Sequence, residues 1–221
     1  MAYPTVSKPY GLKPVNLVGG QVFAGATTKN YPIQYGYSSD IFYGDLVNLT
    51  RGSVTKNTDT TDSTGTGLVG VFLGCQYTSA TTGQLTFSQY YPASLAVKSG
   101  STILAFVADD PDQLFKVVLV SGTTADGNGL TPAFLGRTVI GSNAALVQNT
   151  GSTTTGDSKV GIYTAAGATT TDTLPIRIID VVPDTANSSG NFCEVIVKWN
   201  APNVTGQTVA GGHQYLNPTG V

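Results

Sequence analysis

The chain has 221 residues, a net charge of −2, and only 11% Asp, Glu, Lys and Arg, where average domains hold about a quarter. Enzyme sites are built from titratable groups placed close together, so this composition argues against catalysis. The acidic pI of about 5.1 and the scattered basic residues exclude the electrostatic footprint of a nucleic-acid-binding protein.

The N-terminal residues are rich in proline and tyrosine. Pro4, Pro9 and Pro14 recur at five-residue intervals, with Tyr3 and Tyr10 between them. Proline fixes φ and biases the preceding residue towards extended geometry, so we expect an extended arm over residues 1–20. Two interpretations stay open: a frayed terminus, or an arm whose five named residues contact a neighbouring subunit. The arm has no apolar core of a signal peptide, and no membrane partner is expected.

Two pairs of strands are predicted in the middle of the chain. Residues 68–77 and 84–90 are separated by a loop of small polar residues, and Leu85, Phe87 and Gln89 in the second run alternate with polar neighbours. This pattern predicts a hairpin with a longer loop. Residues 102–108 and 114–120 flank an Asp-Asp-Pro-Asp sequence, which is typical of a tight turn.

Other segments complete an all-β prediction. Further strands are expected at 30–35, 45–50, 161–163, 176–182 and 193–199. Only 93–97 and 144–148 could form one or two helical turns. Three Thr/Ser/Gly-rich stretches, 52–67, 151–157 and 165–173, are predicted to be flexible loops.

The predicted fold is therefore an antiparallel β-barrel or β-sandwich with long loops and an N-terminal arm. We expect one β-rich domain over residues 21–205, with a division into two subdomains near 121–150 as an alternative. Residues 206–221 form a glycine-rich C-terminal tail.

Several motifs resemble ligand sites but lack their context. Residues 65–70 read Gly-x-Gly-x-x-Gly, yet a β run follows where a dinucleotide site needs a helix. Residues 109–112 and 126–129 hold acidic side chains without the spacing of an EF-hand. We therefore expect no cofactor and no metal.

The reactive side chains are few. His213 is the only histidine and lies in a glycine-rich segment, which is a poor platform for a general base. Cys75 and Cys193 are far apart in the sequence and are expected to be buried, reduced thiols. No catalytic residue is predicted.

Several segments, spread over nearly the whole chain, resemble a family of capsid decoration (cement) proteins from tailed, mostly marine, bacteriophages. They are 9–15 with 19–21, 41–47, 106–112 with Phe115, 151–156, and the block from 175–178 to 194–200. The resemblance implies a non-enzymatic, β-rich virion protein, made in the host cytoplasm and bound to the outer surface of an icosahedral capsid. It implies contacts with the major capsid protein and with neighbouring copies. The 52–67 segment departs from the family pattern and is expected to be an outward loop.

A second hypothesis is a tail or receptor-binding adhesin that recognises host-surface carbohydrate. Tyr90 and Tyr91 would then be its sugar platform. The simpler interpretation of these adjacent tyrosines is packing in the core and at an interface.

Overall fold

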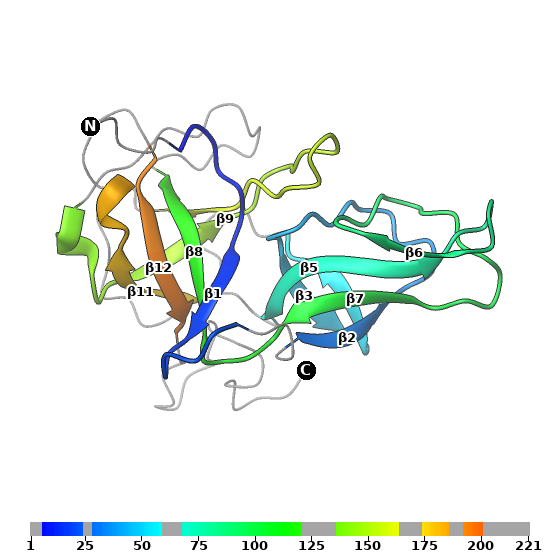
Figure 1. Ribbon diagram of the computed structural model, residues 1–221, viewed down its shortest axis with the longest axis horizontal. Helices are drawn as coiled ribbons and strands as arrows, with labels where there is room; N and C mark the ends of the chain where they lie inside the picture. Colours follow the sequence, from blue (N-terminus) through cyan, green and yellow to red (C-terminus); the bar gives the residue numbers. More distant parts are fainter. Residues whose placement is uncertain are drawn as a thin grey trace.

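The computed structural model describes residues 6–23, 28–58, 68–120, 136–163, 174–185 and 192–200, and it confirms the all-β prediction (Figure 1). The regular elements are β1 (Lys13–Leu17), β2 (Thr28–Ile33), β3 (Leu46–Thr50), β4 (Ser53–Lys56), β5 (Leu68–Thr78), β6 (Leu85–Ser88), β7 (Ile103–Ala108), β8 (Gln113–Val120), η1 (Gly136–Val139), β9 (Asn143–Val147), β10 (Gly161–Tyr163), β11 (Ile176–Val181), η2 (Pro183–Thr185) and β12 (Glu194–Trp199).

One sheet closes into a five-stranded barrel, which we call the C-terminal barrel. Its strand order is β1-β8-β10-β9-β11-β12, and an additional pairing between β8 and β12 completes the ring. The first half of β8 pairs with β1 and its second half with β10, on parallel Ile162–Leu119 and Tyr163–Val120 pairs. Strand β1 is therefore attached to the barrel without being part of its ring.

The other sheet, which we call the N-terminal sheet, has the order β3-β4-β2-β7-β5-β6. A pairing between β3 and β5 turns five of its strands into a second ring, closed between β2 and β4 by the parallel pair of Ile33 with Val54. Strand β6 pairs with the second half of β5, from Cys75 to Thr78. It lies outside this ring, as β1 lies outside the other.

The two rings have the same topology. When β2, β3, β4, β5 and β7 are matched in chain order to β8, β9, β10, β11 and β12, every neighbouring pair is reproduced, with one parallel pair and four antiparallel pairs in each ring. The fourth and fifth strands even share a register irregularity, between Phe72 and Gly74 and between Ile178 and Asp180. The chain thus contains two copies of one five-stranded pattern.

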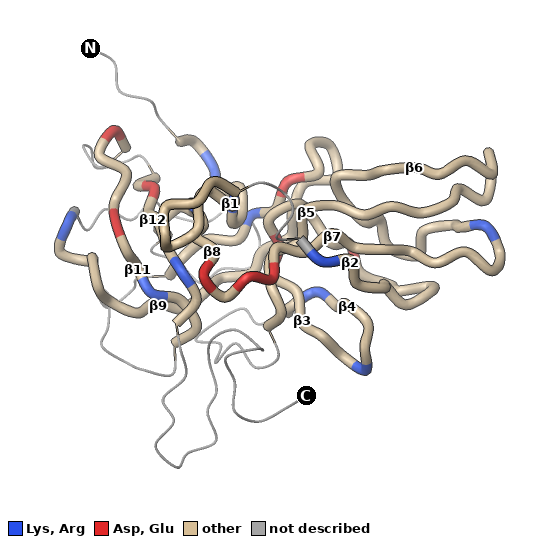
Figure 2. Tube along the Cα trace, turned by 60° about the horizontal axis from the view of Figure 1, so that its bottom comes forward, with Lys and Arg blue, Asp and Glu red and all other residues tan. Residues whose placement is uncertain are grey.

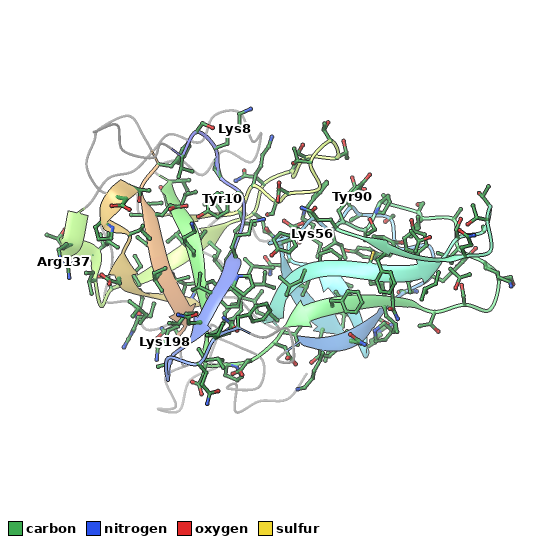
Figure 3. All side chains as sticks on the ribbon, viewed as in Figure 1. Lys8, Tyr10, Lys56, Tyr90, Arg137 and Lys198 are labelled. Atoms are coloured by element: carbon green, nitrogen blue, oxygen red, sulfur yellow. The ribbon has the colours of Figure 1, made fainter. Side chains whose placement is uncertain are left out.

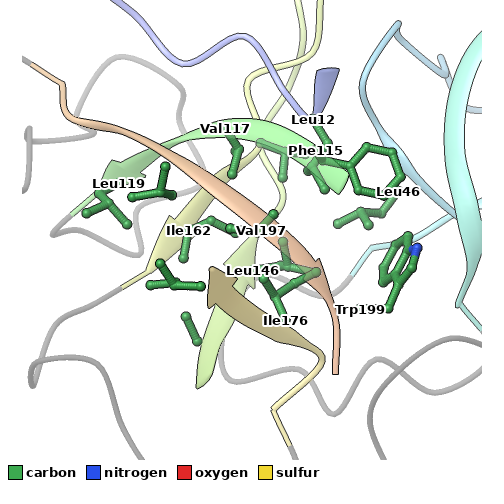
Figure 4. Close-up of a cluster of buried hydrophobic side chains, with 14 of the residues drawn as sticks. Leu12, Leu46, Phe115, Val117, Leu119, Leu146, Ile162, Ile176, Val197 and Trp199 are labelled. Carbon is green, nitrogen blue, oxygen red and sulfur yellow. The ribbon is translucent and has the colours of Figure 1, made fainter. Parts of the chain in front are cut away.

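A continuous hydrophobic core joins the two sheets. The cluster inside the C-terminal barrel also takes in Leu46, Leu68 and Val71 from the N-terminal sheet. Phe115 and Trp199 pack edge to face, with their ring centroids 5.5 Å apart, beside Leu46 (Figure 4). Burial of such side chains contributes about 1.5–3 kcal/mol each. A second cluster fills the N-terminal sheet itself.

Of the predicted extended arm, residues 13–17 are extended as β1, residues 18–20 form a turn and bend, and residues 1–5 lie outside the described ranges. The residues from Pro9 onwards belong to the domain. Pro9 and Leu12 are buried, the Leu12 amide donates to the carbonyl of Gly44, and Pro14 lies opposite Phe115 in the β1–β8 pairing. The predicted boundary between arm and domain at residue 20 is therefore corrected to about residue 9. The reason is that the first half of β8 needs a hydrogen-bonding partner for its backbone groups on this side, and β1 provides it.

The predicted subdomain split near 121–150 is also corrected. The N-terminal sheet comprises residues 28–108 and lies in the sequence between β1 and β8. The division between the two sheets thus falls between β1 and β2 and between β7 and β8. Sequence spacing alone did not show that β1 pairs far along the chain.

Neither predicted helical segment is a helix. Residues 93–97 hold turns and an isolated bridge. Residues 143–147 form β9, in which every side chain is buried and which pairs with β10 and β11. A short apolar run that is buried on both faces has no periodicity by which a strand can be told from a helix. Here the pairing with β10 and β11 makes the segment a strand.

The three predicted loops have different outcomes. Residues 53–56 of the first loop form β4, so its first part is a hairpin, while 59–67 lie outside the described residues. The loop at 151–157 is present and packs on the N-terminal sheet, where a Cβ on Gly151 would meet the ring of Phe42. The loop at 165–173 and the tail at 206–221 lie outside the described residues.

Candidate interaction surfaces

Strand β6 carries two exposed large apolar side chains. Leu85 is 59% and Phe87 67% exposed. Both point to the same face because alternate residues of a strand do so. Phe87 stacks on Phe106 of β7, with ring centroids 6.2 Å apart. We call β6 and the face around Phe87 and Phe106 the β6 ribbon.

An open hollow lies beside Phe87. Its volume is about 440 Å³, and its lining residues are Tyr43, Leu73, Gly74, Cys75, Phe87, Ser88, Gln89 and Phe106. Gly74 has a φ of +136° and leaves no room for a Cβ against the carbonyl of Ser88. The hollow holds no carboxylate or ammonium group, so it suits an apolar or neutral partner.

Charge is distributed unevenly between the two sheets. Between residues 79 and 106 the only charged side chain is Lys98. Figure 2 shows acidic and basic residues along the C-terminal barrel and at its junction with the N-terminal sheet, and almost none around β6. Because fully buried interface cores are depleted of charge and rich in aromatics, the β6 ribbon has the composition of a contact surface.

Tyr10, one of the predicted arm contacts, lies in a charged network on the C-terminal barrel. Tyr10 lies beside β8 and β1 (Figure 3), and its hydroxyl donates a 2.5 Å hydrogen bond to Glu194. Lys116 lies 3.2 Å from the same carboxylate. Burial, together with the bond and the charge of Glu194, raises the pKa of Tyr10.

A second ion pair fixes the start of β1. The ammonium of Lys13 lies 2.8 Å from Asp157 and 3.8 Å from the ring centroid of Tyr43. Burial lowers the pKa of Lys13 against the opposite effect of Asp157. Of the five residues predicted to contact a partner, Pro9, Tyr10 and Pro14 thus pack on their own domain, and Tyr3 and Pro4 lie outside the described residues.

The junction between the sheets contains a fully buried carboxylate. Asp45 accepts hydrogen bonds from Ser158 Oγ at 2.6 Å and from the Phe42 amide at 2.9 Å, and Lys56 lies 3.0 Å away. Burial raises the pKa of Asp45, while Lys56, Ser158 and the Phe42 amide act in the opposite direction. These contacts join strands of one sheet to a loop of the other, which is a structural task.

The described residues hold few candidates for chemistry. No group of three or more His, Cys, Asp or Glu residues in these ranges could hold a metal. Cys75 and Cys193 are buried, as predicted, and unbonded to each other. Burial raises the pKa of Cys75 to about 12, so its reactive thiolate is suppressed. His213 and residues 126–129 lie outside the described ranges.

The acidic segment at 109–112 contains a turn, as its sequence predicted, but it is not the turn of a hairpin, because β7 and β8 belong to different sheets and do not pair. Asp109 is buried and accepts from Tyr31 Oη at 2.7 Å, with Lys29 at 3.1 Å. Asp110 accepts a hydrogen bond from the Asp112 amide at 2.8 Å. These carboxylates are used in the turn and in the contact with β2.

The proposed sugar platform is corrected. Tyr91 is fully buried in the core of the N-terminal sheet and donates to the carbonyl of Tyr37. Tyr90 is half-buried and stacks on Phe42, with centroids 5.5 Å apart. Packing, the simpler interpretation, is therefore correct, because the Ile41–Tyr91 bridge turns the Tyr91 ring into the core.

Sequence reasoning noted the alternation of Leu85, Phe87 and Gln89 but did not single out β6 as a surface. The usable signal was the combination of this alternation with the near absence of charge over residues 79–106. Alternation alone cannot say which face is buried.

No family model matches the chain, and no curated protein or solved structure shows significant similarity to it. Within the described ranges, no helix has the length and hydrophobicity to cross a membrane.

Proposed function

We propose that this chain is a non-enzymatic virion protein that decorates and stabilises an icosahedral phage capsid by binding the major capsid protein. The observation that carries the binding role is the β6 ribbon, in which Leu85 and Phe87 are exposed on an uncharged face. The nature of the partner rests on the segment resemblance to capsid decoration proteins.

The architecture suits this role. Two closely packed rings with a shared core form a stiff support, and the β6 ribbon lies on the sheet at the end away from the C-terminal barrel (Figure 1). Contacts repeated over a capsid lattice gain strength through multivalency, so each contact can be modest. The proposal places the chain on the outer surface of the capsid, beside copies of itself.

The first test counts the chain in purified particles. Gel densitometry should give copies in proportion to the major capsid protein, and the protein should remain on heads that lack tails. A handful of copies per particle would assign it to the tail instead.

The second test asks whether the β6 ribbon contacts the capsid. Phe106→Ser should lower occupancy when the purified protein is added to undecorated heads. Phe106 is partly buried. Tyr35→Ser, at an aromatic position outside the ribbon with 72% exposure, is the control and should leave occupancy unchanged. Equal occupancy of both variants would remove the ribbon from the proposed contact.

The adhesin alternative retains one supporting observation. A hollow of about 350 Å³ lies between the N-terminal segment and the 152–159 loop, and hydroxyls of Ser7, Ser152 and Thr155 are among its lining groups. Hydroxyl-rich hollows suit sugars as hydrogen-bonding partners. A glycan array probed with the purified protein separates the two functions, because decoration requires no glycan binding.

A further inference from the structure

Strand β6 presents an unprotected edge. It is the last strand of the N-terminal sheet and pairs only with β5 among the described strands. Native edge strands are usually blocked by lysine, proline or a covering segment. The sequence of β6, Leu-Thr-Phe-Ser, contains none of these residues. Its outer backbone groups and its two apolar side chains are therefore available to another strand.

From this edge we propose that β6 pairs antiparallel with β6 of a second copy of the chain, across a two-fold axis at Thr86. The inference deepens the proposed function and rests on it for its place on a capsid. The pairing itself is a property of the isolated protein. The pairing joins the N-terminal sheets of the two copies into one continuous sheet and gives a closed, isologous dimer.

The register follows from the side chains. With Thr86 on the axis, Leu85 of each copy lies opposite Phe87 of the other, and all four side chains share one face. Apolar pairs directly opposite each other stabilise antiparallel strands. A shift by one residue would set Leu85 opposite Ser88 and put the apolar side chains of the two copies on different faces.

A second copy also fits the charge of the region. The nearest charged residue in the sequence on the C-terminal side is Lys98, and no carboxylate lies in β6 or in the hollow beside it. Two copies therefore meet at this edge without repulsion between like charges. A strongly charged partner would find no charged side chain in β6 or in the lining of the hollow.

The size of the contact predicts its strength. A join of two four-residue strands is smaller than the roughly 800 Å² per partner of standard stable interfaces. The dimer should therefore be weak and concentration-dependent in solution, and stronger where both copies are held on a common surface. Pairing leaves the faces of both ribbons open side by side, so it doubles the apolar area offered to a capsid.

The experiment is sedimentation velocity of the purified chain from micromolar to about millimolar concentration. We expect a reversible monomer–dimer equilibrium. Phe87→Lys should weaken it at least about tenfold, because each lysine would lie opposite Leu85 and near its symmetry mate. Tyr35→Lys, at a site with 72% exposure away from β6, should associate like the parent chain.

A cysteine placed on the axis tests the register. Paired Cα atoms in an antiparallel sheet lie about 4.5–5.5 Å apart, which is within disulfide range. Thr86→Cys should therefore give a covalent dimer on mild oxidation, whereas two Ser88→Cys residues would lie about 14 Å apart and should not cross-link. The two native cysteines are buried and serve as an internal background.

A chain that stays monomeric at the highest concentration overturns the inference, as does a dimer unaffected by Phe87→Lys or a stronger cross-link at Ser88→Cys. The two proposals fail separately. A monomer that still decorates heads in proportion to the major capsid protein refutes only the pairing. A dimer present in few copies per particle refutes only the capsid role.

Discussion

The C-terminal barrel and the N-terminal sheet repeat one five-stranded topology, but they differ in what is added to the ring. The barrel gains β1 and the segment before it, in which Lys13 forms an ion pair with Asp157 and Tyr10 donates a hydrogen bond to Glu194. The sheet gains β6, which exposes Leu85 and Phe87. Each added strand lies outside the repeated pattern.

This difference distinguishes the strands that build the cores from the strand that leaves apolar surface exposed. The ring strands supply most residues of the two cores, and the pairings that close the rings involve neither addition. The backbone of β1 pairs with β8 of the same chain, and the ammonium of Lys13 pairs with Asp157. Strand β6 leaves apolar surface and a backbone edge open, so the proposed interactions are assigned to it.

The largest effect is expected from Trp199→Ala in the C-terminal barrel. Trp199 is 1% exposed and belongs to the core shared by both sheets. Truncation of a buried tryptophan costs about 3–5 kcal/mol. Urea unfolding followed by far-UV circular dichroism should show one transition at a lower midpoint. Two transitions, of which only one moves, would show that the repeated units unfold independently.

Next in size is Asp45→Ala at the junction of the two sheets. The change removes the partner of Lys56, which is itself largely buried, and breaking a buried pair from one side costs about 3 kcal/mol. Asp45→Asn keeps the shape and part of the bonding to Ser158 and should cost less. A loss below 1 kcal/mol for Asp45→Ala would mean that the junction is held by apolar contacts alone.

The third prediction concerns the attachment of β1. Because Leu12 is fully buried, Leu12→Ala should cost about 2–4 kcal/mol, and deletion of residues 1–14 should cost at least as much. Thermal unfolding of the isolated protein measures both. An unchanged melting temperature in the deletion variant would restore the view that these residues serve only a neighbouring subunit.

The comparison of the predicted elements with the observed strands shows how much of the fold could be predicted from the sequence. Strands with clear alternation or strong turns, such as 102–108 and 114–120, were located correctly because local chemistry determines them. The pairing of β1 with β8 was not foreseeable, since it joins segments about a hundred residues apart. The assignment of 144–148 failed for the same reason: burial on both faces is a tertiary property.

The candidate surface was predictable only in part. The low charge of residues 79–106 can be read from the sequence, but the exposure of Phe87 and the burial of Tyr91 cannot, although both are aromatic residues of the same segment. The β5–β6 pairing and the Ile41–Tyr91 bridge decide which of them faces solvent.

Alkaline pH should destabilise both halves of the molecule, through buried phenols and thiols. Burial raises the pKa values of Tyr10, Tyr43, Tyr91 and Cys75. Unfolded tyrosines ionise near pH 10 and cysteines near 8.5, so above about pH 9 the unfolded chain loses protons that the folded chain keeps. The free energy of unfolding therefore falls as pH rises towards the folded pKa values.

Urea titrations from pH 7 to 10.5 measure this slope. Tyr10→Phe removes one of the groups and should make the decline shallower. A steeper decline in that variant would contradict the raised pKa of Tyr10.

The smallest effect on the free energy of unfolding is expected from a substitution in β6, in contrast to the large effects expected in the C-terminal barrel. Phe87 is 67% exposed, so Phe87→Lys should change the free energy of unfolding of the monomer by no more than about 0.5 kcal/mol. The same substitution should weaken self-association at least about tenfold, because the lysine would lie opposite Leu85 of the second copy. Unfolding must therefore be measured at low concentration, where the monomer dominates. A loss of 2 kcal/mol or more there would mean that Phe87 stabilises the N-terminal sheet through its stacking on Phe106, and β6 would then be part of the fold, as β1 is.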